Sequence, residues 1–328
     1  MTVPKLRDKL NLMPCMIFAA QTTARRSVVA VRCRRGAIVA AAIALPGALP
    51  AQWVPGRDLL DFPLGTVGEA PALATGARIG LWNPAAISTD DARATFGVAA
   101  LATPADQGVS AQLAGLAVRI QGGATVGLSV VRASVRDLLR TEEDPRSVGE
   151  VRYATTLVSA MAARRSGNHL ITGLAVRYRA GQLGSTNRGG VALDGGVVLR
   201  ALGSRDGRLA ASTFLWSPAN QADERATFTG AGDLRLTGAR SPHELRAGYS
   251  YAATERGVRE HFPFVSARRR IWQGRGGFTR SEAHGDARWR LRLGVGVYYA
   301  RYAVAVSREE SGAGLDAIYQ FSLSSTVR

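Results

Sequence analysis

Apolar residues alternate with small or polar residues along most of the chain from about residue 93 onward. The clearest case is 287–299, where every second position is apolar: Trp289, Leu291, Leu293, Val295, Val297 and Tyr299. Successive side chains of a strand point to opposite faces, whereas a helix would scatter these positions around its circumference. The pattern therefore predicts β-strands with one apolar face and one face of glycine, small or charged residues.

The same alternation recurs along the rest of this region, for example in 115–120, 125–130, 170–179, 245–251, 302–307 and 315–324. Clusters rich in glycine, asparagine and serine separate these segments, as turns between strands do. Counting along 93–328 predicts about fourteen strands of roughly 9–14 residues each. No helical periodicity of useful length interrupts them.

Two architectures fit such an all-β chain: a closed membrane barrel and a secreted soluble β protein. Strands of ~9–11 residues cross a bilayer when tilted, whereas strands of soluble sheets average ~5–6 residues. The apolar face suits lipid and the other face suits a lumen. Aromatic residues stand near the expected strand ends, as in interfacial girdles: Tyr153, Tyr178, Trp216, Trp272, Trp289, Tyr299 and Tyr302. We predict an all-β fold, a transmembrane antiparallel β-barrel of about 14 strands, surrounded by lipid of the bacterial outer membrane.

The first fifty residues have a different character. Basic residues cluster at 25–35, and the uncharged run 36–49 follows, ending shortly before Ala51. This run is too short to span the ~30 Å hydrocarbon core as a helix. A basic stretch, a short apolar run and a small residue are the parts of a secretory signal peptide. We predict that residues 1–51 are a signal peptide cleaved near Ala51–Gln52, with a true start that could lie near Arg25.

The number and distribution of charged residues indicate which kinds of partner the protein can bind. The chain carries 42 Lys and Arg against 25 Asp and Glu; without residues 1–51 it keeps 34 and 24, a net charge of +10. Both cysteines, Cys15 and Cys33, leave with the leader, which suits an oxidising compartment. The arginines are spread along strands and turns with acids between them, and no nucleic-acid recognition motif accompanies them. We therefore expect no nucleic-acid partner.

No catalytic or metal-binding motif is present in the sequence. The four histidines, His169, His243, His261 and His284, fall in different segments, and none shows the spacing of a zinc site. No G-x-S-x-G nucleophile elbow occurs, and no glycine-rich loop precedes a helix. We expect a protein that is not an enzyme and that carries no metal and no cofactor.

The segment 52–92 is rich in glycine and alanine, and near its end it contains Trp82-Asn83-Pro84-Ala85-Ala86-Ile87. Such a segment ahead of about fourteen strands resembles the long-chain fatty-acid transporter (FadL-like) superfamily, and within it the PorV/PorQ-type proteins. The residues that match the family motif are Asn83, Pro84 and Ala85. The resemblance implies that 52–92 is a plug in the lumen, or a segment at which solutes enter, ahead of a barrel formed by 93–328. Pro84 would stiffen a turn there, and Asn83 would bond backbone groups that barrel strands leave unpaired.

Several arginines fall on the faces expected to line the lumen: Arg177, Arg179, Arg288, Arg290 and Arg292. They would raise a positive potential inside the barrel. The main expectation, however, is that they form ion pairs in the lumen with acids such as Asp194, Asp233 and Asp316.

Three functions remain open at this level. The FadL-like resemblance implies passage or handling of a hydrophobic or amphipathic substrate, with a lipid-like small molecule as ligand. The PorV-type members imply instead a barrel that does not transport and that works with proteins of a secretion system. The arginine lining would suit a small pore that prefers anions.

Overall fold

The computed structural model describes residues 53–60, 69–76, 79–89, 91–104, 108–136, 138–141, 147–217, 226–238, 241–255, 257–283, 286–310 and 317–328. The predicted signal peptide, 1–51, lies outside these ranges. The described residues belong to one compact unit, Ala48–Arg328.

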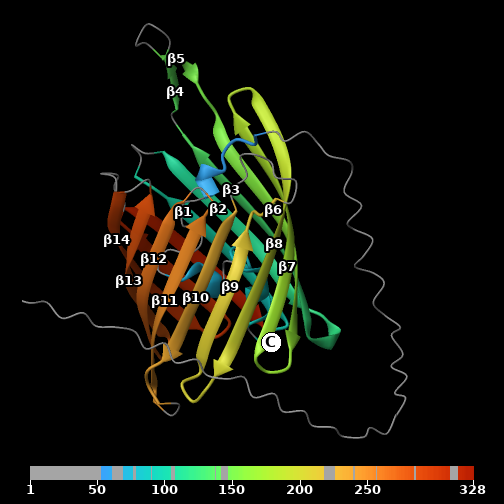
Figure 1. Cartoon of the computed structure of the whole chain (residues 1–328), viewed down its shortest axis with the longest axis vertical. Helices are drawn as coiled ribbons and strands as arrows, with labels where there is room; N and C mark the ends of the chain where they lie inside the picture. Colours follow the sequence, from blue (N-terminus) through green and yellow to red (C-terminus); the bar gives the residue numbers. More distant parts are fainter. Residues whose placement is uncertain are drawn as a thin grey trace, which may run out of the picture. The chain divides into compact units, whose positions relative to one another are not determined.

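Fourteen antiparallel strands close into a barrel in the order β1-β16-β15-β14-β13-β12-β11-β10-β9-β8-β7-β6-β3-β2 (Figure 1). They are β1 (Ala94–Ala102), β2 (Val109–Arg119), β3 (Ala124–Val135), β6 (Tyr153–Ser166), β7 (Leu170–Leu183), β8 (Thr186–Leu202), β9 (Gly207–Phe214), β10 (Thr227–Arg235), β11 (His243–Thr254), β12 (Arg259–Arg269), β13 (Trp272–Ala283), β14 (Asp286–Tyr299), β15 (Tyr302–Glu309) and β16 (Ile318–Val327). The predicted fold class and strand number are confirmed.

Closure joins the first strand to the last. Ala94 of β1 lies opposite Val118 of β2 on one side and opposite Val327 of β16 on the other. A closed sheet has no edge strand, so every strand has a neighbouring strand on both sides.

The barrel has two unlike ends. At one end, here called the short-turn end, the connections are brief; β14 and β15, for example, are joined by Ala300 and Arg301 alone. At the other, the loop end, longer connections occur, and the one between β3 and β6 holds a separate two-stranded sheet of β4 (Leu139–Thr141) and β5 (Ser147–Glu150). In Figure 1 this small sheet lies at the top and the C-terminus near the bottom.

Burial alternates along the strands as the sequence pattern predicts. In β7, Leu174 and Val176 are exposed on the outer face, and Leu174 keeps 69% of its surface accessible. Ala175 and Arg177 between them are buried on the inner face. The outer face is thus a band of exposed Leu, Val, Phe, Tyr and Trp side chains, the composition of lipid-facing positions.

The strand lengths differ from the expected range at both extremes. β9 and β15 have 8 residues, and β8 has 17. β8 is long because it pairs with β7 from Thr186 to Leu199, whereas its contact with β9 begins only at the isolated bridge between Leu193 and Trp216. The part of β8 before Leu193 therefore has a strand partner on one side only among the described residues.

The described residues of the N-terminal segment include short 3-10 helices that pack against the inner wall. They are η2 (Asp58–Leu60), η3 (Pro71–Leu73) and η5 (Pro84–Ser88). η5 contacts β6, β7 and β8, and η3 contacts β9 and β10. One further 3-10 turn, η6 (Gln121–Gly123), joins β2 to β3. No helix in the described part of the chain is long and apolar enough to cross a membrane.

Candidate functional site

The lumen is the candidate site, and the described N-terminal residues, here called the plug, occupy part of it. Buried charges on the wall hold the plug by its backbone. Arg177 of β7 donates hydrogen bonds to the carbonyl oxygen of Leu81 at 2.6 Å and to Ser159 Oγ at 2.9 Å. Its Nε bonds the Asp194 carboxylate, and its guanidinium lies 5.1 Å from the ring centre of Phe214. Both members of the Arg177–Asp194 pair are fully buried.

Arg179, two residues further along β7, holds the start of the plug. It donates to the carbonyl oxygens of Pro55 at 2.7 Å and Val54 at 3.0 Å. The backbone passes so close to β7 here that a Cβ on Gly181 would stand 1.9 Å from the Pro55 carbonyl oxygen. The glycine is therefore required by the contact between wall and plug.

The predicted motif lies at the centre of this contact. Asn83 caps η5, because its side-chain oxygen accepts from the Ala85 N–H at 3.0 Å. Its amide donates to the carbonyl oxygens of Ala72 at 2.8 Å and of Val197 at 3.4 Å. Pro84 occupies the first position of the helix, where its missing N–H costs no hydrogen bond. Asn83, Pro84 and Ala85 are buried. Through its hydrogen bonds to Ala72, Ala85 and Val197, Asn83 joins two parts of the plug to the backbone of β8.

Replacing Asn83 by alanine should lower the free energy of unfolding by roughly 1–3 kcal/mol, because η5 loses its cap and the carbonyl oxygens of Ala72 and Val197 lose their donor. Urea unfolding of the folded barrel, followed by tryptophan fluorescence, measures this. Asn83→Asp should recover only part of the loss, because a carboxylate accepts from Ala85 but cannot donate to Ala72. Asn168→Ala, at an exposed turn residue, is the control. Equal midpoints for Asn83→Ala and this control would refute the assigned role.

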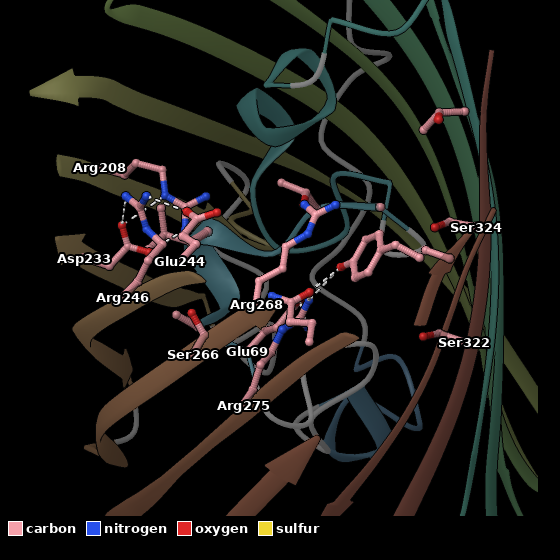
Figure 2. A pocket seen from close by; sticks show the side chains of 18 of the residues that line it. Glu69, Arg208, Asp233, Glu244, Arg246, Ser266, Arg268, Arg275, Ser322 and Ser324 are labelled. Atoms are coloured by element: carbon pink, nitrogen blue, oxygen red, sulfur yellow. Dashed lines mark hydrogen bonds and ion pairs between the residues drawn. The ribbon is translucent and has the colours of Figure 1, made fainter. Parts of the chain in front are cut away.

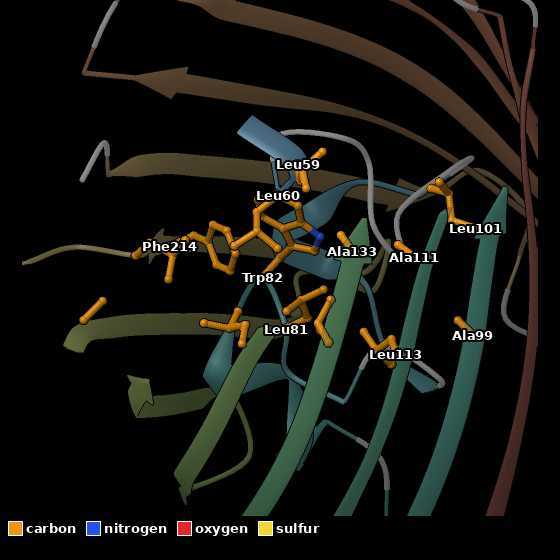
Figure 3. Packing of buried hydrophobic residues seen from close by; sticks show 14 of the residues in the cluster. Leu59, Leu60, Leu81, Trp82, Ala99, Leu101, Ala111, Leu113, Ala133 and Phe214 are labelled. Atoms are coloured by element: carbon orange, nitrogen blue, oxygen red, sulfur yellow. The ribbon is translucent and has the colours of Figure 1, made fainter. Parts of the chain in front are cut away.

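The loop-end half of the lumen is apolar. Figure 3 shows Leu59, Leu60, Leu81 and Trp82 of the plug packed among side chains of the wall. The wall contributes Ala99, Leu101, Ala111, Leu113, Val131, Ala133, Leu157, Ala192, Phe214 and Ile318 to this cluster. The rings of Trp82 and Phe214 lie 4.4 Å apart, centre to centre. We call this set the apolar lumen cluster.

The short-turn half holds a polar cavity of about 380 Å³. Plug residues Glu69 to Gly76 form one side of it, and β9 to β16 form the other. The charged residues that line it are six arginines and three carboxylates: Arg208, Arg246, Arg268, Arg275, Arg301, Arg328, Glu69, Asp233 and Glu244. In Figure 2, Arg208, Asp233, Arg246 and Glu244 gather on one side, and Ser322 and Ser324 lie across the cavity.

Ion pairs cross from strand to strand and from strand to plug around this cavity. Asp233 of β10 bonds Arg208 of β9 and, at 2.9 Å, Arg246 of β11. Arg275 of β13 bonds Glu69 of the plug. Asp233 is buried, so its two arginines replace the water that a carboxylate would otherwise hold. The cavity keeps an excess of positive charge because arginines outnumber carboxylates.

A second ion-pair cluster lies in the loop-end half of β12, β14 and β15. Arg292 bonds Glu309 at 2.9 Å, and Arg290 bonds the same carboxylate at 2.9 Å and also bonds Glu260. Glu309 is fully buried, and Arg292 is nearly so. The positive charge of these two arginines is therefore compensated inside the barrel.

The sequence-predicted arginines lie as follows. Arg177, Arg179 and Arg292 are buried on the inner face and Arg290 is partly buried, whereas Arg288 is exposed near the loop-end terminus of β14. Asp194 pairs with Arg177, one of the predicted arginines, whereas Asp233 pairs with Arg208 and Arg246, which were not among them. Asp316 lies outside the described residues. Sequence reasoning missed Arg208, Arg246, Glu69 and Arg275 as lumen residues. Arg208 and Arg246 could have been found from the sequence, because they occupy inward positions on strands next to the one that carries Asp233. No feature of the sequence indicates that Glu69 pairs with Arg275.

The end of the plug is tied down at the short-turn end. Arg165 donates to the Ser88 carbonyl oxygen and to the Asp91 carboxylate, both at 2.8 Å. Arg200 donates to the Thr89 carbonyl oxygen at 3.0 Å. The hydrogen bond from Arg165 lowers the pKa of the Asp91 carboxyl below its ordinary value, and the charge of Arg200 acts in the same direction. Wall and plug are thus joined at the point where the plug runs into β1.

The described histidines do not assemble a catalytic centre. His169 contacts the Arg200 carbonyl oxygen, and His261 bonds the Tyr249 hydroxyl on the outer face. His284 lies outside the described residues. Within the described ranges, no group of three His, Cys, Asp or Glu side chains is placed to hold a metal ion.

Comparisons with known proteins agree with the architecture. No family model matches the chain, and no curated protein matches it in sequence. Among solved structures it is similar to CymD, a monoaromatic hydrocarbon channel, at 11% identity and a TM-score of 0.55, over 84% of this chain and 98% of that one. It is also similar to a FadL homologue of Pseudomonas aeruginosa, at 13% identity and a TM-score of 0.50, over 81% and 97%.

The fold and the lumen define the class: a closed, fourteen-stranded antiparallel β-barrel with an N-terminal plug. The likeness to CymD and to the FadL homologue, at 11% and 13% identity, is a likeness of fold.

Proposed function

We propose that this protein is an outer-membrane barrel through which small hydrophobic or amphipathic solutes pass. The apolar lumen cluster carries the proposal. Water-filled porins have a polar interior, whereas here Leu101, Leu113, Val131 and Leu157 turn apolar side chains inward. A solute arriving from the loop end would meet this surface first and the polar cavity second.

Two further observations support the proposal. The band of exposed apolar side chains on the outer wall needs a lipid environment, because soluble proteins rarely leave so large an apolar area in water. CymD is a monoaromatic hydrocarbon channel, and the resemblance of the motif at Asn83, Pro84 and Ala85 points to FadL-like proteins. The likeness to CymD and the FadL-like motif both suggest that the substrate is a hydrophobic solute.

Uptake into vesicles tests the proposal. Vesicles containing the barrel should take up an apolar aromatic probe faster than empty vesicles do, with little change for a sugar of similar size. Leu113→Asn places an amide in the apolar lumen cluster and should slow probe uptake several-fold, about the effect of ~1–2 kcal/mol on a barrier. Ser322→Asn, on the wall of the polar cavity, is the matched control. Equal uptake by the two variants, both folded, would contradict a hydrophobic path.

The same preparations separate the other two functions. A component of a secretion system should co-purify with exported proteins and should not accelerate probe uptake. An anion-preferring pore should conduct in planar bilayers, and charge reversal at Arg288, Arg290 and Arg292 should change its ion preference. The compensation of Arg290 and Arg292 by Glu260 and Glu309 argues against the pore.

A further inference from the structure

Two turns at the short-turn end carry exposed arginines at the rim of the barrel, and one of these, Arg301, also borders the polar cavity. Arg269 is the last residue of β12, Arg270 follows it in the turn to β13, and Arg301 lies in the turn between β14 and β15. β13 pairs with both β12 and β14, so the two turns are neighbours around the rim. A backbone hydrogen bond from Tyr298 N–H to the Ile271 carbonyl oxygen at 2.7 Å joins them.

These guanidinium groups have no acidic partner among the described residues. Arg269 and Arg270 are exposed and make no side-chain hydrogen bond or ion pair there, and Arg301 contacts only the ring of Tyr302, 5.1 Å away. Glu244 of β11 and Glu69 of the plug line the polar cavity, where Glu244 bonds Arg246 and Glu69 bonds Arg275. We call Arg269, Arg270 and Arg301 the basic rim patch.

Outward-facing aromatic side chains adjoin the patch on the strands just above the turns. Trp272, Tyr299 and Tyr302 have 57%, 73% and 44% of their surface exposed. Trp272 lies opposite Arg269 across the β12–β13 hairpin, and Tyr299 lies opposite Tyr302 across the next. Amphipathic rings in such positions sit at the level of lipid headgroups. The arginines are therefore placed where phosphates of the leaflet would lie.

We propose that the basic rim patch binds the phosphates of anionic phospholipid headgroups in the leaflet at the short-turn end. The proposal rests on the membrane location proposed above. A guanidinium offers a planar fork of donors to phosphate, and each basic residue near an anionic surface strengthens binding about fivefold. A lipid suits the patch better than a water-soluble acidic protein, because the patch continues directly into aromatic side chains that a lipid tail can cover.

Lipid binding by the full-length barrel in detergent micelles tests the proposal. Native mass spectrometry at rising phosphatidylglycerol or phosphatidylcholine counts the lipids retained. The triple variant Arg269→Gln, Arg270→Asn, Arg301→Gln should lose phosphatidylglycerol affinity by tenfold or more. Asparagine is chosen at 270 because that residue has φ of 51°, which Asn tolerates. Added salt should weaken the wild-type preference as well.

The matched control removes three charges from the loop end, where Arg136, Arg152 and Arg188 are exposed. Arg136→Gln, Arg152→Gln, Arg188→Gln should retain phosphatidylglycerol as the wild type does. Equal loss in both triple variants, or no wild-type preference over phosphatidylcholine, would overturn the proposal. So would a rim variant that keeps its lipid and loses only binding to an acidic peptide. A chain that stays folded and monodisperse without detergent would overturn the membrane location itself.

Discussion

Asp194→Asn is expected to lower the free energy of unfolding by about 3–5 kcal/mol, because Arg177 would then stay buried without its counter-charge. The cation would also remain locked in place, since the same guanidinium donates to Leu81 of the plug and to Ser159 of β6. Urea titration of the barrel in lipid vesicles, followed by electrophoretic mobility and tryptophan fluorescence, gives the free energy.

Asp206→Asn provides the matched control. Asp206 bonds Arg246 at 3.2 Å, but its side chain keeps 54% of its surface exposed, so water can replace the contact. We expect a loss of at most ~1 kcal/mol there. The double variant Arg177→Met, Asp194→Asn should recover part of the stability, because the uncompensated charge is gone while the plug carbonyl of Leu81 stays without its donor. A loss for Asp194→Asn no larger than for Asp206→Asn would show that the pair does not stabilise the fold.

The second large effect is expected at Gly196 of β8. A Cβ there would stand 2.0 Å from Asn83 Oδ1 and 3.0 Å from Pro84 Cδ, closer than side chains approach one another. Gly196→Val should therefore expel η5 from the wall, at a cost of about 1–3 kcal/mol or more, while the strands still close. Protease should then cut the N-terminal segment, and the conductance of the barrel in planar bilayers should rise.

Gly195→Val, the neighbouring position on the same strand, is the control. Only Leu174 comes within 4.0 Å of a Cβ built there, so a side chain has space. This variant should keep the N-terminal segment protected and the conductance of the wild type. If both variants protect the segment equally, η5 does not dock on β8 as described.

The alternation of apolar residues, together with the strand lengths and the aromatic residues near the strand ends, predicted the barrel. A period of two allows only strands, and strands exposed to lipid on one face must close into a barrel because hydrocarbon offers no hydrogen bonds to a free edge. The residues of β7 and β14 face the sides that this rule assigns, with Leu174 outside and Arg177 inside. Strand lengths were less predictable. How far β8 extends depends on its pairing with β7, which continues beyond the residues that β9 reaches, and the β8 segment alone does not reveal that pairing.

The ion pairs of the lumen could not be predicted from the sequence in the same way. The position of Arg177 on the inner face follows from its own segment, but its partner does not. Asp194 stands two residues beyond Ala192, which lies directly opposite Arg177, so the contact depends on the register between β7 and β8. In the same way Asp233 reaches Arg208 and Arg246 because β9, β10 and β11 are adjacent.

Local periodicity thus determined the strands, their two faces and the need for closure, since each of these follows from the direction of successive side chains along one segment. Only the tertiary structure decided which charges neutralise each other and where the plug docks. The bond between Glu69 and Arg275 joins residues that are 206 positions apart in the sequence. Such contacts depend on the register of the strands and on the enclosure of the plug by the barrel, which together bring residues distant in the sequence side by side.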